Sequence, residues 1–291
     1  MIGFVVPLWV WMALGFSFCG AVIVAYNQWA KLDGRALVVG RVVGIWPLAG
    51  LSLVFFPWPV EWQFYAVAAL MGVGLAYADV CLFNASRKHG ARLTAMYVPL
   101  KMLLAFGLWV MINPMSLLPV LSVWWKVVLL VVGFGLCSGA LGNIRRSDTG
   151  LRALVAVLPV AVLFALADVV AKHLLGEVGG NWSDVVGRAV AFLAVTSTVG
   201  AVGGVIFGGL PRYKRRQFLR AAGFGVTLLM SLTLLLLTIW LAPNPGYVAA
   251  ITMLSGLWLA FYGRFMRGER NNWWAGLVLL LGALCVGLAV V

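Results

Sequence analysis

Ten long apolar segments limit what this chain can fold into. Each is close to the ~20 residues that a helix needs to cross the hydrocarbon core of a bilayer. Outer-membrane strands instead alternate apolar and polar residues, so continuous apolar runs indicate helices. Charged residues make up only 10% of the chain, against about 25% in soluble domains. The sequence therefore predicts an all-α integral membrane protein with ten transmembrane helices. The segments cover residues 4–27, 36–56, 62–83, 93–112, 120–142, 151–173, 185–209, 219–241, 246–263 and 273–291.

A short polar element occurs twice, which indicates an internal repeat. In each copy a polar residue precedes a lysine by one helical turn, a loop follows, and an arginine lies just inside the next apolar segment. The copies are Asn27–Lys31–Arg41 and Asp168–Lys172–Arg188. We predict one five-helix repeat over residues 1–146 and a second over 147–291, divided within the polar stretch 143–150. An odd number of helices in each repeat makes the second repeat inverted in the membrane, as in many transporters.

Basic residues gather in the loops after the first, third, fifth, seventh and ninth segments. The opposite side has far fewer: Lys172, with Lys126 and Arg188 just inside their segments. The positive-inside rule then places the basic loops in the cytoplasm and both termini outside. We expect the protein to lie in the cell (inner) membrane. The net charge of +13 is explained by this topology and by contact with anionic lipid headgroups. We expect no nucleic-acid partner.

Residue clusters typical of enzymes and metal sites are absent from the sequence. All four cysteines lie in apolar segments without paired spacing, which indicates small core residues rather than disulfides. His89 and His173 have no metal-ligand spacing between them. No phosphate-binding loop of the Gly-Lys-Ser/Thr type is present. We therefore expect no enzymatic activity, no metal and no cofactor.

Two further motifs complete a resemblance to a known family. Pro245-Gly246-Tyr247-Val248-Ala249-Ala250 opens the ninth segment, and Gly268-Glu269-Arg270 precedes the tenth. The first half has the related Tyr97-Val98-Pro99-Leu100. With the doubled lysine–arginine element, nearly the whole chain resembles the drug/metabolite transporter (DMT) superfamily, specifically its EamA-type members.

This resemblance has departures as well as implications. Asn113-Pro114 stands where the family has a Glu, and Gly256 replaces its usual proline. The resemblance implies a transporter fold around a central cavity and leaves the solute open. Many relatives are described with both termini inside, whereas the charge distribution here places them outside.

Ionisable residues within apolar segments are the first candidates for a substrate site, because each costs about 2.5–3.5 kcal/mol on insertion scales. Asp79 and Lys101 lie on segments joined by a short loop, so they could be antiparallel neighbours. Lys101 lies nine residues beyond Arg92, roughly 13 Å along a helix axis and thus near mid-bilayer. In the second repeat Asp79 aligns with Leu236 and Lys101 aligns with Trp258. The two charges are therefore absent from the second repeat, and charges that break the repeat symmetry are better candidates for substrate or proton binding. A purely structural ion pair is the alternative.

Asp168 and Lys172 are one helical turn apart, which favours a local pair. Asn27 and Lys31 are their counterparts in the first repeat. A buried Asp168 could exchange protons during transport. The alternative is a pair at the membrane interface with Lys172 snorkelling.

The remaining candidates are repeated arginines and aromatic rings. Arg41 of the first repeat and Arg188 of the second are counterparts, so we expect a structural role in which each bonds carbonyl groups of neighbouring helices. Tyr26, Tyr97 and Trp258 could line an apolar cavity, although an interfacial belt is the alternative for any single ring. The predicted substrate-binding residues are thus Tyr26, Asn27, Asp79, Tyr97, Lys101, Asp168 and Trp258.

The sequence as a whole favours a secondary transporter. We expect export of a small organic metabolite, such as an amino acid, by alternating access between inverted halves. The partners would be the solute, membrane lipids and a proton or counter-solute, with the protein a monomer. A flippase for a lipid-linked headgroup and a non-transporting membrane scaffold are the alternatives.

Overall fold

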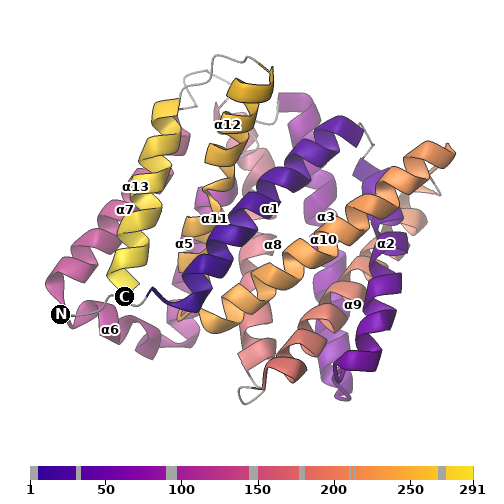
Figure 1. The fold of residues 1–291 in the computed structure, drawn as a ribbon, viewed down its shortest axis with the longest axis horizontal. Coiled ribbons are helices and arrows are strands. Elements are labelled where there is room, and N and C mark those ends of the chain that lie inside the picture. Colours follow the sequence, from indigo (N-terminus) through magenta and orange to yellow (C-terminus); the bar gives the residue numbers. More distant parts are fainter. Residues whose placement is uncertain are drawn as a thin grey trace.

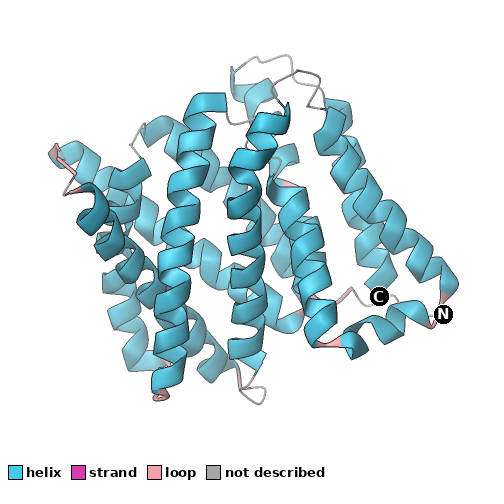
Figure 2. Ribbon diagram, turned by 180° about the vertical axis from the view of Figure 1, so that it is seen from behind, coloured by secondary structure: helices cyan, strands magenta, loops and turns pink. Residues whose placement is uncertain are grey.

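The computed structural model describes residues 6–30, 34–89, 97–143, 150–176, 181–209, 211–212, 214–267 and 273–290. Within these residues every regular element is helical, which confirms the all-α prediction (Figure 2). The helices are α1 (Leu8–Ala30), α2 (Gly34–Phe55), α3 (Trp62–His89), α5 (Tyr97–Ile112), η1 (Pro114–Leu117), α6 (Leu118–Leu121), α7 (Trp124–Asn143), α8 (Gly150–Gly176), α9 (Trp182–Gly208), α10 (Arg215–Leu241), α11 (Pro245–Thr252), α12 (Ser255–Arg267) and α13 (Trp273–Val290).

Length and hydropathy make this a multi-pass membrane protein. Five of the described helices are long and apolar enough to cross a bilayer, or six if α5 and the bent η1–α6 piece form one span. Shorter apolar helices occur within α1, α7, α11–α12 and α13. A helical membrane protein is therefore confirmed, while the number of ten spans stays a prediction.

Two predicted segments have a different form in the structure. After α5 the chain bends by 120° into η1 and α6, where Met115, Leu118 and Leu121 are exposed. The segment predicted over residues 246–263 is two helices, α11 and α12. Between them the amides of Leu254 and Gly256 donate to carbonyls three residues back, and this tighter pattern ends the regular α-helix.

The packing partners of the two halves correspond in pairs. In chain order, α1 corresponds to α8, α2 to α9, α3 to α10, α5 to α11–α12, and α7 to α13. Helix α2 packs on α10 as α9 packs on α3, α1 packs on α10 as α8 packs on α3, and α5 packs on α8 as α11 and α12 pack on α1. The pairs α2–α9, α5–α11 and α7–α13 each join a helix to its own counterpart.

Contacts near helix ends show which ends lie together. Glu61, just before α3, pairs with Arg188 in the second turn of α9. Trp182, at the start of α9, packs edge-on against Trp240 near the end of α10. Lys172, in the last turns of α8, also binds Trp240. Helices α8 and α10 therefore end on the side where α3 and α9 begin. Figure 1 shows the first turn of α1 and the last turn of α13 on this same side.

Glycine permits a close helix crossing, that of α2 with α10. A Cβ on Gly44 would lie 1.9 Å from the carbonyl oxygen of Ala222, and one on Gly225 would lie 2.0 Å from that of Arg41. Both distances are far below van der Waals contact. A side chain at either position would therefore force the two helices apart.

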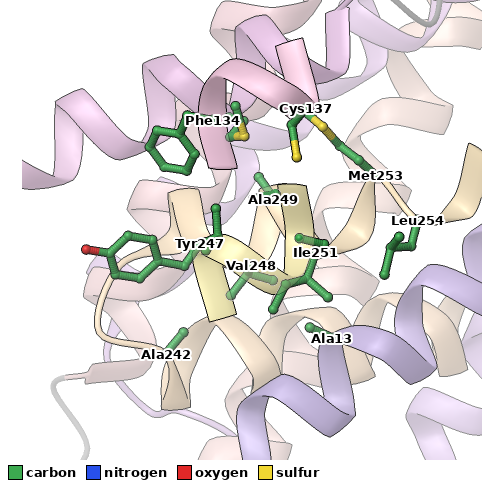
Figure 3. Close-up of a cluster of buried hydrophobic side chains, with 14 of the residues drawn as sticks. Ala13, Phe134, Cys137, Ala242, Tyr247, Val248, Ala249, Ile251, Met253 and Leu254 are labelled. Carbon is green, nitrogen blue, oxygen red and sulfur yellow. The ribbon is translucent and has the colours of Figure 1, made fainter. Parts of the chain in front are cut away.

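The short helix α11 forms the centre of one of the two large apolar cores. Its residues from Pro245 to Ile251 are all buried. Tyr247 packs against Phe106 of α5 and Phe134 of α7, and Figure 3 shows Phe134 and Cys137 of α7 above the same short helix. A helix that is apolar on every side fits an interior position in this way.

Candidate functional site

A buried ion pair joins the first half of the chain to the second. The ammonium of Lys101 on α5 lies 2.7 Å from a carboxylate oxygen of Asp168 on α8, and their side chains are 15% and 10% exposed. The ring of Phe164, one turn before Asp168, lies 5.9 Å from the same ammonium. Next to the pair, Met102 and Ala165 are fully buried. Each charge thus depends on the other for compensation in an apolar environment.

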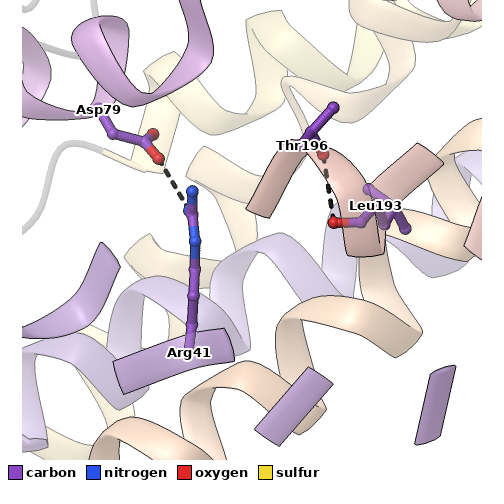
Figure 4. A network of polar contacts seen from close by, with 4 residues as sticks. All are labelled: Arg41, Asp79, Leu193 and Thr196. Carbon is purple, nitrogen blue, oxygen red and sulfur yellow. Dashed lines mark hydrogen bonds and ion pairs between the residues drawn. The ribbon is translucent and has the colours of Figure 1, made fainter. Parts of the chain in front are cut away.

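Asp79 pairs with Arg41, so the predicted Asp79–Lys101 neighbourhood is wrong. The Arg41 guanidinium on α2 donates to the Asp79 carboxylate at 2.8 Å (Figure 4). The physical reason is helix order: α5 packs on α8 and α11, while α3 packs on α8 and α9. A short connection between two segments does not make them neighbours. Arg41 therefore meets a carboxylate rather than the carbonyl groups we expected, and its Nε atom is buried without a hydrogen-bond partner among the described residues.

Lys172 does not pair with Asp168, contrary to the prediction. Its ammonium donates to the carbonyl oxygens of Trp240 at 2.5 Å and Ala242 at 2.6 Å. Helix α10 ends at Leu241, where the last carbonyl groups have no helical partners and favour a cation. The ring of Trp109 lies 5.8 Å from the same ammonium.

Arg188 also binds a carboxylate, one that the sequence did not single out. Its guanidinium donates to Glu61 at 2.7 Å, and the Glu61 side chain is 48% exposed. A hydrogen bond from its own backbone N–H and the charge of Arg188 hold the pKa of Glu61 below its ordinary value, against the opposing effect of desolvation. Glu61 precedes an apolar segment by one residue, and nothing in that position points to Arg188.

The two predicted aromatic residues whose side chains are described, Tyr26 and Trp258, do not lie together. The Tyr26 hydroxyl donates to the carbonyl of Arg220 at 3.0 Å, and its ring packs against Trp29. The Trp258 indole donates to the Ser17 hydroxyl at 3.0 Å. Ser17 and Tyr26 are nine residues apart on α1, roughly 13 Å along the helix. Asn27 and Tyr97 lie on α1 and α5, but their side chains fall outside the described part of the structure.

The Trp258–Ser17 bond makes the site asymmetric in an informative way. It joins α12 to α1, and this contact corresponds to the one between α5 and α8 in the other half. One interface thus carries the Lys101–Asp168 ion pair, and its counterpart carries a neutral hydrogen bond. The buried charge pair is a specific feature of one interface and not a requirement of the repeated packing.

Trp109 makes a polar contact that was not predicted from the sequence. Its indole donates to the Pro243 carbonyl at 2.9 Å, in the connection between α10 and α11. Trp109 and Lys172 together donate to backbone carbonyl groups at the end of α10 and in the connection that follows it. As one of fourteen tryptophans, it carried no signal that could have distinguished it.

Among the described residues, no three histidines, cysteines or carboxylates gather where they could hold one metal ion. The four cysteines are free thiols.

Comparisons with known proteins identify a fold and no family. No family model and no curated protein matches the chain. One solved structure matches 98% of this chain and 99% of its own, with a TM-score of 0.68 and 11% sequence identity. It is described only as a crystal structure of a protein, so the similarity establishes a shared architecture and leaves activity open.

Proposed function

We propose that this protein is a secondary transporter of the DMT superfamily, EamA type, that moves a small organic metabolite across the cell (inner) membrane. Ten spans in two inverted halves, residues 1–146 and 147–291, would alternate access to a site between them, most simply for export. The protein would work as a monomer, without enzymatic activity. A proton or counter-solute would supply the driving force.

The paired helix contacts support the inverted arrangement. Helix α8 ends on the side where α1 begins (Figure 1), and α10 ends on the side where α3 begins. These are corresponding helices in the two halves. Opposite directions for corresponding helices are what inverted repeats require.

The observation that carries the proposal is the Lys101–Asp168 pair. It lies on the contact between α5 of the first half and α8 of the second, with both side chains at least 85% buried. Ionisable residues at membrane depth are expensive and usually mark a substrate or ion pathway. The corresponding α12–α1 interface holds together with a neutral bond instead. Packing of this interface therefore does not by itself demand charges.

Flux through purified protein tests the proposal. The protein would be reconstituted into liposomes loaded with a mixture of unlabelled amino acids and organic acids, and entry of labelled solutes would be followed by counterflow. We expect saturable exchange that is lost in Lys101→Ala and kept in Lys126→Ala, whose ammonium lies against the ring of Trp125. Movement of a fluorescent lipid instead would favour the flippase. If folded protein moves neither solutes nor the lipid, the non-transporting scaffold becomes the favoured function.

A further inference from the structure

The Lys172 ammonium has an incomplete set of partners. An ammonium has three N–H donors, and two of them meet the carbonyl oxygens of Trp240 and Ala242. No acceptor for the third, and no carboxylate, is found among the described residues. The carbonyl groups lie at the negative end of the α10 dipole, so they offset part of the charge but not all of it.

The charges of the described residues around Lys172 leave one positive charge in excess. Lys172 lies one turn after Asp168, so the two side chains share a face of α8. Asp168 is already paired with Lys101. The group of three thus carries two cations and one anion, and its net charge is +1.

The other described carboxylates are engaged elsewhere. Glu61 binds Arg188 and Asp79 binds Arg41. Asp184 accepts from the Asn181 side chain at 3.3 Å. Of the described helices packed against α8, namely α3, α5, α9, α10 and α11, none carries a carboxylate that forms an ion pair with Lys172.

We propose that Lys172 is an anion-binding residue, and that the transported solute carries a single net negative charge on an apolar or aromatic body. Its carboxylate or phosphate would accept the third N–H bond and bring the three-charge group to neutrality. Burying an uncompensated charge is costly, so a monoanion stabilises this group where a zwitterion or a cation does not. The ring of Trp109, which lies 5.8 Å from the ammonium and is itself buried, makes the surroundings of this position apolar and so suits an apolar or aromatic body. The inference rests on the proposed function only in taking the bound anion as the transported solute.

Three probes with the same phenyl body and different charges test this proposal. The protein would be placed in phosphatidylcholine nanodiscs, and binding of 3-phenylpropanoate, phenylalanine and 2-phenylethylamine measured with radiolabelled compounds. We expect the anion to bind at least about tenfold more tightly than the zwitterion, and the cation not to bind. Equal affinities for the three would overturn the proposal.

Two variants with opposite expected effects locate the site. Lys172→Met should weaken binding of 3-phenylpropanoate roughly ten- to a hundredfold, as expected for loss of a charged hydrogen bond, while Lys172→Arg keeps most of it. Asp168→Asn should tighten binding, because it increases the excess of positive charge. Unchanged binding in Lys172→Met, or weaker binding in Asp168→Asn, would reject the site. The comparison of the three probes on the wild-type protein decides the matter even if neither Lys172→Met nor Asp168→Asn folds.

Lipid composition separates the two sources of the anion. Phosphatidylglycerol added to the nanodiscs should leave binding of 3-phenylpropanoate unchanged if the site takes a solute. Displacement by this lipid would assign the site to a headgroup and overturn the solute. Binding that needs Lys172 without any flux in liposomes would refute transport and leave the anion site. Flux of the probes that does not depend on Lys172 would refute the anion site and leave transport.

Discussion

Removing Asp168 should destabilise the protein far more than removing the whole ion pair. Asp168→Leu leaves the Lys101 ammonium without its counter-ion at a side-chain exposure of 15%. Breaking a buried pair in this way costs about 3–5 kcal/mol, whereas replacing both charges by apolar side chains of similar size is close to neutral. The double variant Lys101→Met/Asp168→Leu should therefore recover most of the lost stability. Equilibrium unfolding by SDS in mixed micelles would give the free energy of unfolding for each variant.

The half-exposed pair at the helix starts is the comparison. Glu61 lies at the same 2.7 Å from its arginine, but its side chain is 48% exposed, while that of Arg188 is 13% exposed. Water can take the place of this carboxylate beside the Arg188 guanidinium, so Glu61→Leu should destabilise the protein less than Asp168→Leu. If the double variant is as unstable as the sum of its two single variants, the reasoning about charge compensation fails.

The same double variant separates a structural pair from a functional one. If it folds with the stability of the wild type, its flux in liposomes can be compared directly. Loss of counterflow would then show that the charges serve transport. Unchanged counterflow would leave them as a structural connection between α5 and α8.

Three further results are expected. Gly44→Ala should destabilise the protein by about 1–3 kcal/mol, because its Cβ would meet a backbone carbonyl of α10 at 1.9 Å; Gly50→Ala on the same helix meets open space and should be neutral or gain up to about 1 kcal/mol in SDS unfolding. In a cysteine-free background, Ser122→Cys and Lys214→Cys should react with an impermeant maleimide from opposite sides of the membrane, and labelling from one side would exclude the proposed topology. Because the pKa of Glu61 is lowered in the folded protein, its carboxylate stabilises the fold above its ordinary pKa of about 4.3, and this contribution is lost as the pH falls through the lower folded value. Glu61→Gln should therefore lose less thermal stability than the wild type when the pH is lowered below about 4.3. If the melting temperatures of the two proteins fall in parallel with pH, the Glu61 carboxylate does not stabilise the fold.

Helix positions were largely predictable because each apolar segment has to match the thickness of a bilayer. The sequence also located the polar residues at membrane depth, including Lys101 and Asp168. Two features of the fold could not be predicted from apolar segments. The break between α11 and α12 lies inside a continuously apolar segment, and hydropathy has no means of marking it. The bend into η1 and α6 joins two apolar pieces that together look like the end of one segment and the start of the next.

The partners of the charged residues could not be predicted. Asp79 was expected beside Lys101 and lies against Arg41, while Lys101 pairs with Asp168 of the other half. Chain order gives each helix two sequence neighbours, but the packed bundle gives it several more. Which of these presents a charge at the right depth depends on helix crossings, and those depend on close approaches such as Gly44 against α10.

By itself the sequence determined the solvent of this protein, since a chain with so few charges cannot cover a surface in water and its apolar segments have to lie in lipid as helices. Only the tertiary structure decided which charges compensate one another. Electrostatic pairing acts over a few ångströms between side chains far apart in the chain, so it is set by the packing of helices and not by their order.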